Sequence, residues 1–253
     1  MTGIVYSAAC DPGAALPELI AAAVASGCGS VELFRHRTTS SVDQSDWSVT
    51  GIRKALATAG ITLGNYEIRP LTGRKGDSDE RNRAYNLRQL EWDVHLGRAL
   101  GIRHVVVRGG ARNGEAREDL IAGLGELVER IPDVVFCLAP EVDTPLEVAN
   151  DFTELRAELP DSVRWALDTA SLLGAGEDVA AVLEAEIDRA HVVRVGDVND
   201  VGDGVALGTG ALPLDAVKAL LAGFDGVIVA ESACGTGVSA IFADVGADQP
   251  AAQ

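Results

Sequence analysis

Four charged residues near the ends of late apolar runs are the side chains of this sequence best placed for chemistry. Glu141 ends the run VVFCLAPE, Asp168 ends VRWALD, Arg194 lies within HVVRVGD, and Glu231 ends GVIVAE. Each run has the aliphatic character of a buried strand and is followed by a helical pattern. Charged residues at the strand ends of a parallel barrel are where active sites usually form. We therefore predict that these four residues form a ring around one site.

Carboxylates that converge on a pocket have two chemical uses. They bind hard divalent cations such as Mg²⁺ or Mn²⁺, which prefer oxygen ligands. They also donate and accept protons at a substrate carbon, a role for which Glu141 and Glu231 are the candidates. The alternative that involves no substrate is a structural cluster of ion pairs with Arg194.

The sequence that must position these residues alternates between strand-like and helical patterns. Strand-like runs lie at about 4–9, 30–35, 61–68, 104–109, 134–141, 163–168, 189–196 and 226–231, and helical patterns at about 14–26, 46–59, 81–100, 115–130, 146–158, 177–187 and 212–223. Eight strands and seven helices in alternation predict an α/β fold, a single (β/α)8 TIM barrel. The alternative is an open doubly wound sheet. No GxGxxG motif follows the first strand, so we expect no nucleotide cofactor.

We expect one domain with its core at about 4–232 and no linker. Helix starts are predicted at Ser45-Asp46 and at the segment 212–215, and glycines that end helices at Gly27, Gly60 and Gly101. The segment after Glu231 has room for only a short last helix, and the tail from about 240 to 253 is predicted to be mobile. The glycine-rich segment 202–210 lacks Lys and Arg, so we predict a mobile loop rather than a phosphate site.

Other strand ends supply side chains that we predict to bind a substrate: His36, Glu67, Arg108, Ser171 and Asp197. His36 is the histidine expected at the barrel mouth, with a solvated loop residue as the alternative. The other histidines, His95, His104 and His191, fall in a helix or at strand starts, so we expect them to be structural.

Cys10 and Cys234 follow the first and last strands, which are neighbours in a closed barrel. No base accompanies either cysteine in the sequence, so a nucleophilic role is not predicted. The four cysteines form no CxxC pair, a pattern typical of thiols in a reducing compartment. The N-terminus does not have the pattern of a signal peptide, and no apolar run reaches the ~18 residues of a membrane span, so we expect a cytoplasmic protein.

The net charge of −17 bears on the partners of the protein. A strongly acidic surface is repelled by nucleic-acid phosphates and by anionic membranes, so neither is expected as a partner. We expect a small-molecule substrate instead.

Several motifs in order resemble the xylose isomerase-like TIM-barrel superfamily, which includes sugar phosphate isomerases and epimerases. They are SGCGSVELF (26–34), HLGRALGIRHVVVRGG (95–110), the glutamate at the end of strand five, ALDTAS (166–171), RVGD (194–197) and GTGALPLDAVKALLAGFDGVIVAES (208–232). The resemblance covers about residues 4–232. It implies carbohydrate metabolism and is compatible with a homo-oligomer.

The resemblance implies a divalent metal such as Mn, Mg, Co or Zn, held by Glu, Asp, His and Glu at the ends of strands five to eight. Glu141, Asp168 and Glu231 match three of these ligands, while Arg194 stands where the family has histidine. A second family histidine, after strand six, is Ser171 here. Arginine keeps its proton and repels a cation, so a metal requires Arg194 to turn away. Otherwise Arg194 would replace the metal as an electrophile that stabilises an oxyanion.

Two functions remain open from the sequence. The first is an isomerase, epimerase or lyase that acts on a small polyhydroxy or keto compound through an enolate-like intermediate, with Glu141, Glu231 and Arg194 as catalytic residues. The second is a non-catalytic barrel, a ligand-binding or partner protein that has lost the metal site. A nuclease-like relative fits poorly because the chain is acidic and lacks the histidines that such relatives use.

Overall fold

Eight parallel strands close into a barrel in the computed structural model, which describes residues 4–42, 48–72, 80–231, 241–242 and 245. The strands are β1 (Val5–Ser7), β2 (Ser30–Phe34), β3 (Thr62–Glu67), β4 (His104–Arg108), β5 (Val135–Ala139), β6 (Arg164–Asp168), β7 (Ala190–Val195) and β10 (Val227–Ala230). Each strand pairs with the next along the chain, and β10 pairs with β1 to close the barrel. The prediction of a (β/α)8 barrel is thus confirmed.

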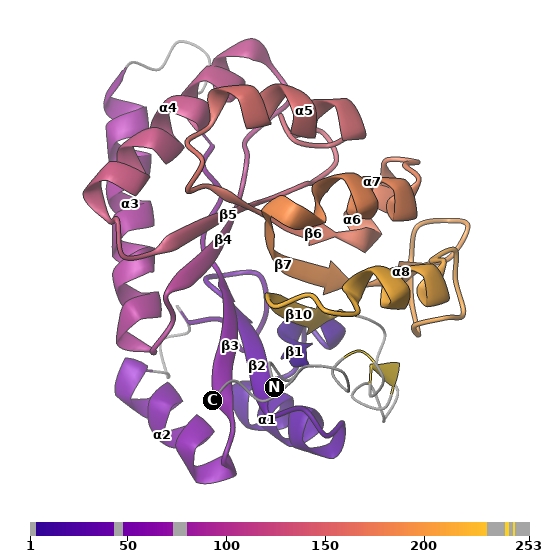
Figure 1. The fold of residues 1–253 in the computed structure, drawn as a ribbon. Coiled ribbons are helices and arrows are strands. Elements are labelled where there is room, and N and C mark those ends of the chain that lie inside the picture. The colour runs from indigo at the N-terminus through magenta and orange to yellow at the C-terminus, as the bar shows by residue number, and fades with distance from the viewer. Residues whose placement is uncertain (1–3, 43–47, 73–79, 232–240, 243–244, 246–253) are drawn as a thin grey trace.

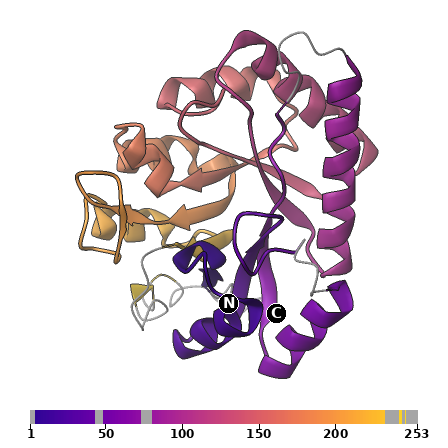
Figure 2. The same ribbon diagram turned by 180° about the vertical axis from the view of Figure 1, so that it is seen from behind.

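Helices surround the strands in chain order (Figure 1; Figure 2 gives the opposite view). They are α1 (Leu16–Ala25), α2 (Val49–Ala59), α3 (Glu80–Ala99), α4 (Gly114–Arg130), α5 (Ala149–Glu158), α6 (Thr169–Gly174), α7 (Val179–Glu186) and α8 (Leu214–Leu221). The short helix α6 was not predicted, because six residues are too few for a helical period to be read. None of the helices in the described part of the chain is long and apolar enough to cross a membrane.

The predicted helix ends are largely confirmed. Gly27, Gly60 and Gly101 adopt positive φ angles of 74°, 71° and 99°, the left-handed conformation that glycine adopts without strain. Helix α2 begins later than predicted, at Val49, and the side chain of Ser48 caps it by accepting a hydrogen bond from the Gly51 amide at 3.0 Å. The predicted start at Ser45-Asp46 lies outside the described residues.

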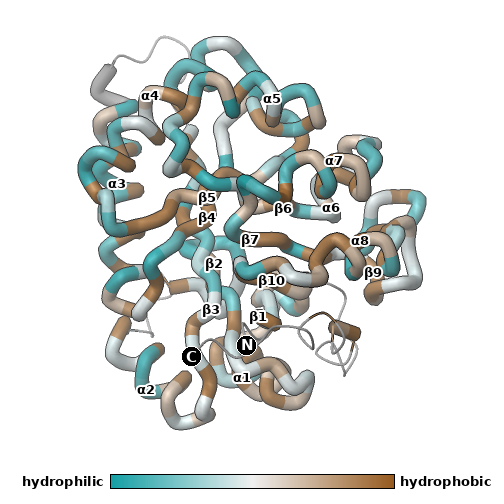
Figure 3. The backbone as a smooth tube through the Cα atoms, in the orientation of Figure 1, coloured by the Kyte–Doolittle hydropathy of each residue, from teal (hydrophilic) through white to brown (hydrophobic). Residues whose placement is uncertain are grey.

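The strands separate two apolar regions. The larger core lies between barrel and helices, where outward strand residues such as Tyr6 and Val107 pack against helix residues such as Leu124. In Figure 3 the helices alternate between hydrophilic and hydrophobic segments, as expected for helices with one face on a core. A smaller cluster fills the barrel interior, and we call it the apolar layer: Val5, Val106, Cys137, Ala139, Ala166, Val192 and Val229.

The segment after β7 is more ordered than predicted. It contains a two-stranded antiparallel ribbon of β8 (Asp197–Val198) and β9 (Gly204–Val205), which lies beside α8. The predicted loop at 202–210 therefore includes the short strand β9 in its first part. Most of the segment after Glu231, with Cys234, the predicted short helix and the predicted mobile tail, lies outside the described residues.

Candidate active site

A layer of polar side chains lies inside the barrel next to the apolar layer, two residues closer to the carboxyl ends of the strands. Side chains alternate between the two faces of a strand, so the residue two positions after an apolar-layer residue also points inward. Val192 is thus followed by Arg194, Val106 by Arg108 and Val229 by Glu231. We call the residues at this level the charged layer: Ser7, Glu32, Glu67, Arg108, Asp168, Arg194 and Glu231.

Arg194 lies at the centre of the charged layer, with its side chain 0% exposed. Its Nη2 donates to Oε1 of Glu32 and its Nη1 to Oε2 of Glu67, both at 2.5 Å. Nη1 also lies 3.8 Å from Oδ2 of Asp168, and Nε lies 3.9 Å from Oε2 of Glu231. Arg194 therefore points into the barrel and pairs with carboxylates on four other strands or strand ends.

Glu32 belongs to the charged layer, although the predicted ring of four residues did not include it. Its Oε1 accepts from Nδ2 of Asn65 at 2.6 Å and from Nε of Arg194 at 3.0 Å, while its Oε2 accepts from Oγ of Ser7 at 2.5 Å. Glu32 stands in the middle of the buried strand SVELF, between outward-facing Val31 and Leu33. Its place near the end of a strand-like run makes Glu32 a candidate at this pole from the sequence, but the sequence does not show that it bonds to Arg194.

Arg108 is the second cation of the charged layer. It donates to Oδ2 of Asp168 at 2.8 Å, to Oε2 of Glu67 at 3.3 Å and to the carbonyl of Pro140 at 2.6 Å. Burial by itself would raise the pKa of Glu67, but Arg194, Arg108 and Arg37 outweigh it and hold that pKa well below its ordinary value. The pKa of Asp168 is also lowered, because Arg108 and Arg194 outweigh its burial. Both carboxylates are therefore ionised and already paired with arginine.

Glu231 is the exception among the carboxylates. Burial, reinforced by the negative charge of Asp168, raises its pKa to about 7, although Arg194 opposes this. Its side chain is 25% exposed, and its Oε2 has no hydrogen-bond partner within the described part of the chain. Glu231 can therefore exchange a proton near neutral pH, which its ionised neighbours cannot do.

Glu141 lies farther out than the predicted ring implied. Strand β5 ends at Ala139, which takes the inward position next to the charged layer, so Glu141 falls two residues beyond the strand. It lines a pocket of about 160 Å³ at the barrel mouth, which we call the arginine pocket and which is formed by residues 35–37, Glu67, Ile68, Pro70, Arg108 and Glu141. The exposed residue His36 lies there too, as predicted for a residue of the mouth.

Ser171 and Asp197 have contacts within the protein. The amide of Ser171 donates to Oδ1 of Asp168 at 3.0 Å, which caps α6, and its Oγ lies 3.5 Å from Nη1 of Arg108. Asp197 is 1% exposed and accepts three backbone hydrogen bonds of 2.9 Å, from the amides of Gly208, Gly210 and Leu212. Its carboxylate therefore holds the loop between β9 and α8.

Replacing Asp197 with alanine is expected to lower the free energy of unfolding by about 3 kcal/mol, because three amide groups lose a charged acceptor. Denaturation in urea measures this loss. Asp200→Ala, at an exposed position of the turn between β8 and β9, is the matched control and is expected to be neutral. An Asp197→Ala variant that is as stable as the control would contradict the holding role.

The charged layer is connected to the opposite pole of the barrel through Asn65. Oδ1 of Asn65 lies 3.1 Å from Nε2 of His104, while its Nδ2 donates to Glu32. The ring of His104 stacks edge-on against His191, with centroids 4.9 Å apart. Burial, with a smaller effect of His191, lowers the pKa of His104 to about 4. These two histidines are therefore held neutral at the pole where the sequence placed them.

We expect the contribution of His104 to stability to be lost as the pH falls from about 6.5 towards 4. A histidine whose pKa is depressed in the folded state contributes its full stability above its unfolded pKa of about 6.5. Below that pH the unfolded chain binds a proton that the folded protein does not, so the contribution is lost as the pH falls. A His104→Gln variant, which keeps an amide donor but does not titrate, should be destabilised less than the parent by the same fall in pH. Urea denaturation at a series of pH values measures both slopes, and equal slopes would contradict the assignment.

The residues of the charged layer do not fit a divalent metal. No group of three or more His, Cys, Asp and Glu side chains in the described ranges is arranged to hold an ion. Arg194 places its guanidinium within 4 Å of both Asp168 and Glu231, and Asp168 is already bonded to Arg108. A cation would meet these two positive groups at the position where the resemblance implies a metal.

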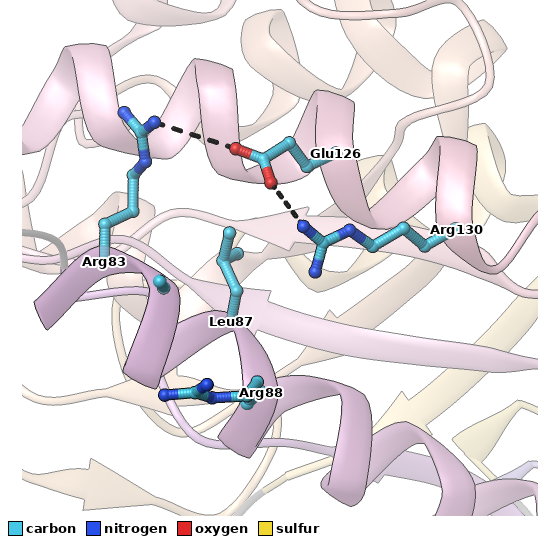
Figure 4. Close-up of a pocket in the computed structure, with 6 residues that line it drawn as sticks. Arg83, Leu87, Arg88, Glu126 and Arg130 are labelled. Carbon is cyan, nitrogen blue, oxygen red and sulfur yellow. Dashed lines mark hydrogen bonds and ion pairs between the residues drawn. The ribbon is translucent and has the colours of Figure 1, made fainter. Parts of the chain in front are cut away.

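A second hollow lies between α3 and α4, on the outer face of the barrel (Figure 4). There Glu126 bridges two arginines, with Nη2 of Arg130 at 2.8 Å and Nη2 of Arg83 at 3.7 Å. None of its lining residues belongs to the charged layer or to the arginine pocket. We therefore place the candidate active site at the strand ends.

Comparison with known proteins agrees with this architecture. The model of the xylose isomerase-like TIM barrel family matches residues 20–249. An L-ribulose 3-epimerase structure superposes with a TM-score of 0.76 at 18% identity, covering 100% of this chain and 89% of that one. The probable 3-DHS dehydratase AsbF from Bacillus anthracis superposes with a TM-score of 0.73 at 12% identity, covering 96% of this chain and 97% of that one. An IOLI protein with a bound zinc atom superposes with a TM-score of 0.74 at 17% identity, covering 96% of this chain and 95% of that one. A search of curated proteins finds no match. The family model covers most of the chain, and the chain therefore belongs to the xylose isomerase-like TIM barrel family.

Proposed function

We propose that this protein is an isomerase- or epimerase-like enzyme that moves a proton on a carbon next to a carbonyl group in a small polyhydroxy or keto compound. The observation that carries the proposal is Glu231, a partly exposed carboxylate at a strand end with a pKa near 7. A general base works best when its pKa lies near the working pH. Sugar epimerases among the structural neighbours, such as the D-psicose 3-epimerase, support the same class of reaction.

In the proposed reaction Glu231 removes the proton and the carbonyl oxygen becomes an enolate oxygen. Arg108 is the cation placed to stabilise that oxygen, because it lines the arginine pocket and interacts electrostatically with both Glu141 and Glu231. Glu141 is the proposed second proton donor, on the pocket side of Arg108. Returning the proton to the opposite face of the same carbon gives an epimer, and returning it to the neighbouring carbon gives an isomer.

Arg194 takes a positioning role in this proposal. Its side chain is fully buried, so it does not meet a substrate in this arrangement. Its positive charge offsets the negative charge of the carboxylates in the charged layer, as a bound metal ion would. We therefore propose that the reaction needs no divalent metal.

Solvent exchange tests the proposal. The protein is incubated in D₂O with a panel of aldoses, ketoses and keto acids, and the loss of the α-proton signal is followed by NMR. Exchange with at least one compound, unchanged by EDTA, is the expected result. Exchange that EDTA abolishes and Mn²⁺ restores would overturn the metal-free reaction.

The second candidate is a non-catalytic binding barrel. The closed set of ion pairs around Arg194 favours it, because buried charges that satisfy one another have a structural use without any reaction. Saturable binding of a panel compound without any proton exchange would support this candidate and overturn the enzyme.

A further inference from the structure

The arginine pocket contains more positive charge than the rest of the protein leads one to expect. The chain has 38 acidic and 21 basic residues, yet three arginines line this hollow of about 160 Å³ against two carboxylates, Glu67 and Glu141. Glu67 is also shared with Arg194 below the pocket. Three of the eight residues that line the pocket are therefore arginines, of which Arg35 and Arg108 also pair with Asp93 and Asp168 outside the lining.

Arg37 is the arginine of the pocket with donors to offer. Its Nη1 donates to Oε1 of Glu67 at 2.8 Å, and its guanidinium carbon lies 5.1 Å from the ring centre of Phe34. These two contacts fix the plane of the group. Its side chain is 43% exposed and lines the pocket, so its remaining N–H groups are accessible to a ligand.

The loop that carries Arg37 is held in place by its own hydrogen bonds. The amide of Arg35 donates to the Glu67 carbonyl at 2.8 Å and that of Thr39 to the Pro12 carbonyl at 2.8 Å. The amide of Thr38 donates to Oγ of Ser41 at 2.9 Å. Arg35 is itself fixed, because its Nε donates to Asp93 at 2.8 Å. The guanidinium groups are therefore positioned before any ligand arrives, which reduces the entropy lost on binding.

Guanidinium groups have only donors, so they match groups that have only acceptors. A neutral sugar presents hydroxyl groups that both donate and accept, whereas a carboxylate or a phosphate only accepts. The volume holds about five water molecules at roughly 30 Å³ each, which suits one end of a small molecule.

We propose that the arginine pocket binds an anionic end group of the substrate, so that the substrate is a small polyhydroxy or keto acid rather than a neutral sugar. This inference rests on the proposed function in treating the bound molecule as a substrate, but the binding itself does not depend on catalysis. Arg37 is the residue that contacts the anion, and the buried charge of Arg108, which also lines the pocket, adds to the attraction.

A binding titration tests this proposal without requiring turnover. Ligand-observed NMR is used with D-glycerate, with glycerol as the neutral counterpart and with inorganic phosphate. Glycerate is expected to bind saturably and glycerol at least tenfold more weakly. Arg37→Met should weaken glycerate binding roughly tenfold to a hundredfold, the usual effect of losing a charge-assisted hydrogen-bonded pair. Arg53→Met removes the same charge from an exposed site on α2 and should change nothing.

The outcomes separate the two proposals. Equal binding of glycerate and glycerol, or an Arg37→Met variant that binds glycerate like the parent, would overturn the anion pocket. Phosphate that binds more tightly than glycerate would keep the pocket and assign it to a phosphate ester instead of an acid. If the protein binds glycerate but exchanges no proton on any compound, the proposed enzyme function is overturned and the anion pocket is kept.

Discussion

Replacing Arg194 with methionine is expected to lower the free energy of unfolding by about 3 to 5 kcal/mol. The guanidinium is fully buried and pairs directly with Glu32 and Glu67, which have no access to water to compensate for its loss. Methionine keeps most of the volume but leaves these carboxylates without their main cation. Chemical denaturation with a circular-dichroism signal measures the difference.

The matched control is Arg103→Met. Arg103 is 66% exposed and pairs with Asp133 at 2.7 Å, so its loss should cost less than 1 kcal/mol. Should Arg194→Met fail to fold, Arg194→Lys keeps the charge while losing the forked geometry, and its stability should fall between parent and methionine variant. A methionine variant within 1 kcal/mol of the parent would mean that Arg194 does not hold the charged layer together.

Replacing Glu231 with glutamine is expected to lower kcat about 10²- to 10⁴-fold once a substrate is known, because the amide cannot accept the proton. The parent enzyme should gain activity as the pH rises through about 7, where Glu231 becomes ionised. The variant should lose this limb of the profile. Steady-state rates between pH 5 and 9 measure both effects.

Stability provides a second readout for Glu231 that a folding defect would not mimic. The folded pKa is raised, so between the unfolded value near 4.5 and about 7 the folded state binds more protons than the unfolded state. The contribution of Glu231 to stability therefore falls as the pH rises through this window. Glutamine removes that fall, so the variant should be at least as stable as the parent at pH 8. A variant that is inactive but also markedly less stable at pH 8 would contradict the role given to Glu231.

The barrel could be predicted from the sequence because its signals are local. Each strand is a short aliphatic run such as HVVVR, and several helices end at a glycine such as Gly60. Buried parallel strands must have such runs, since both of their faces meet apolar neighbours. The pattern of the ribbon β8–β9 is weaker, because it depends on Asp197 binding amides more than ten residues away.

The site could be predicted only in part, because it depends on which side chains face inward. The sequence placed Asp168, Arg194 and Glu231 near one another, and the structure brings them together around the guanidinium. The sequence also puts Glu32 near a strand end of the same pole, but its bond to Arg194 depends on which face of each strand points inward. It also placed Glu141 in the ring, although the chain has already left the strand at that residue.

The arrangement around Arg194 restricts how this site can change during evolution. Glu32 bonds at once to Arg194, to Ser7 and to Asn65, and Glu67 bonds to three arginines. A single exchange of Arg194 for a smaller neutral residue leaves buried negative charges without a partner. Such a substitution therefore destabilises the fold. Descendants of this protein are therefore free to vary at the pocket rim, while the centre of the barrel can be rebuilt only by several coordinated substitutions.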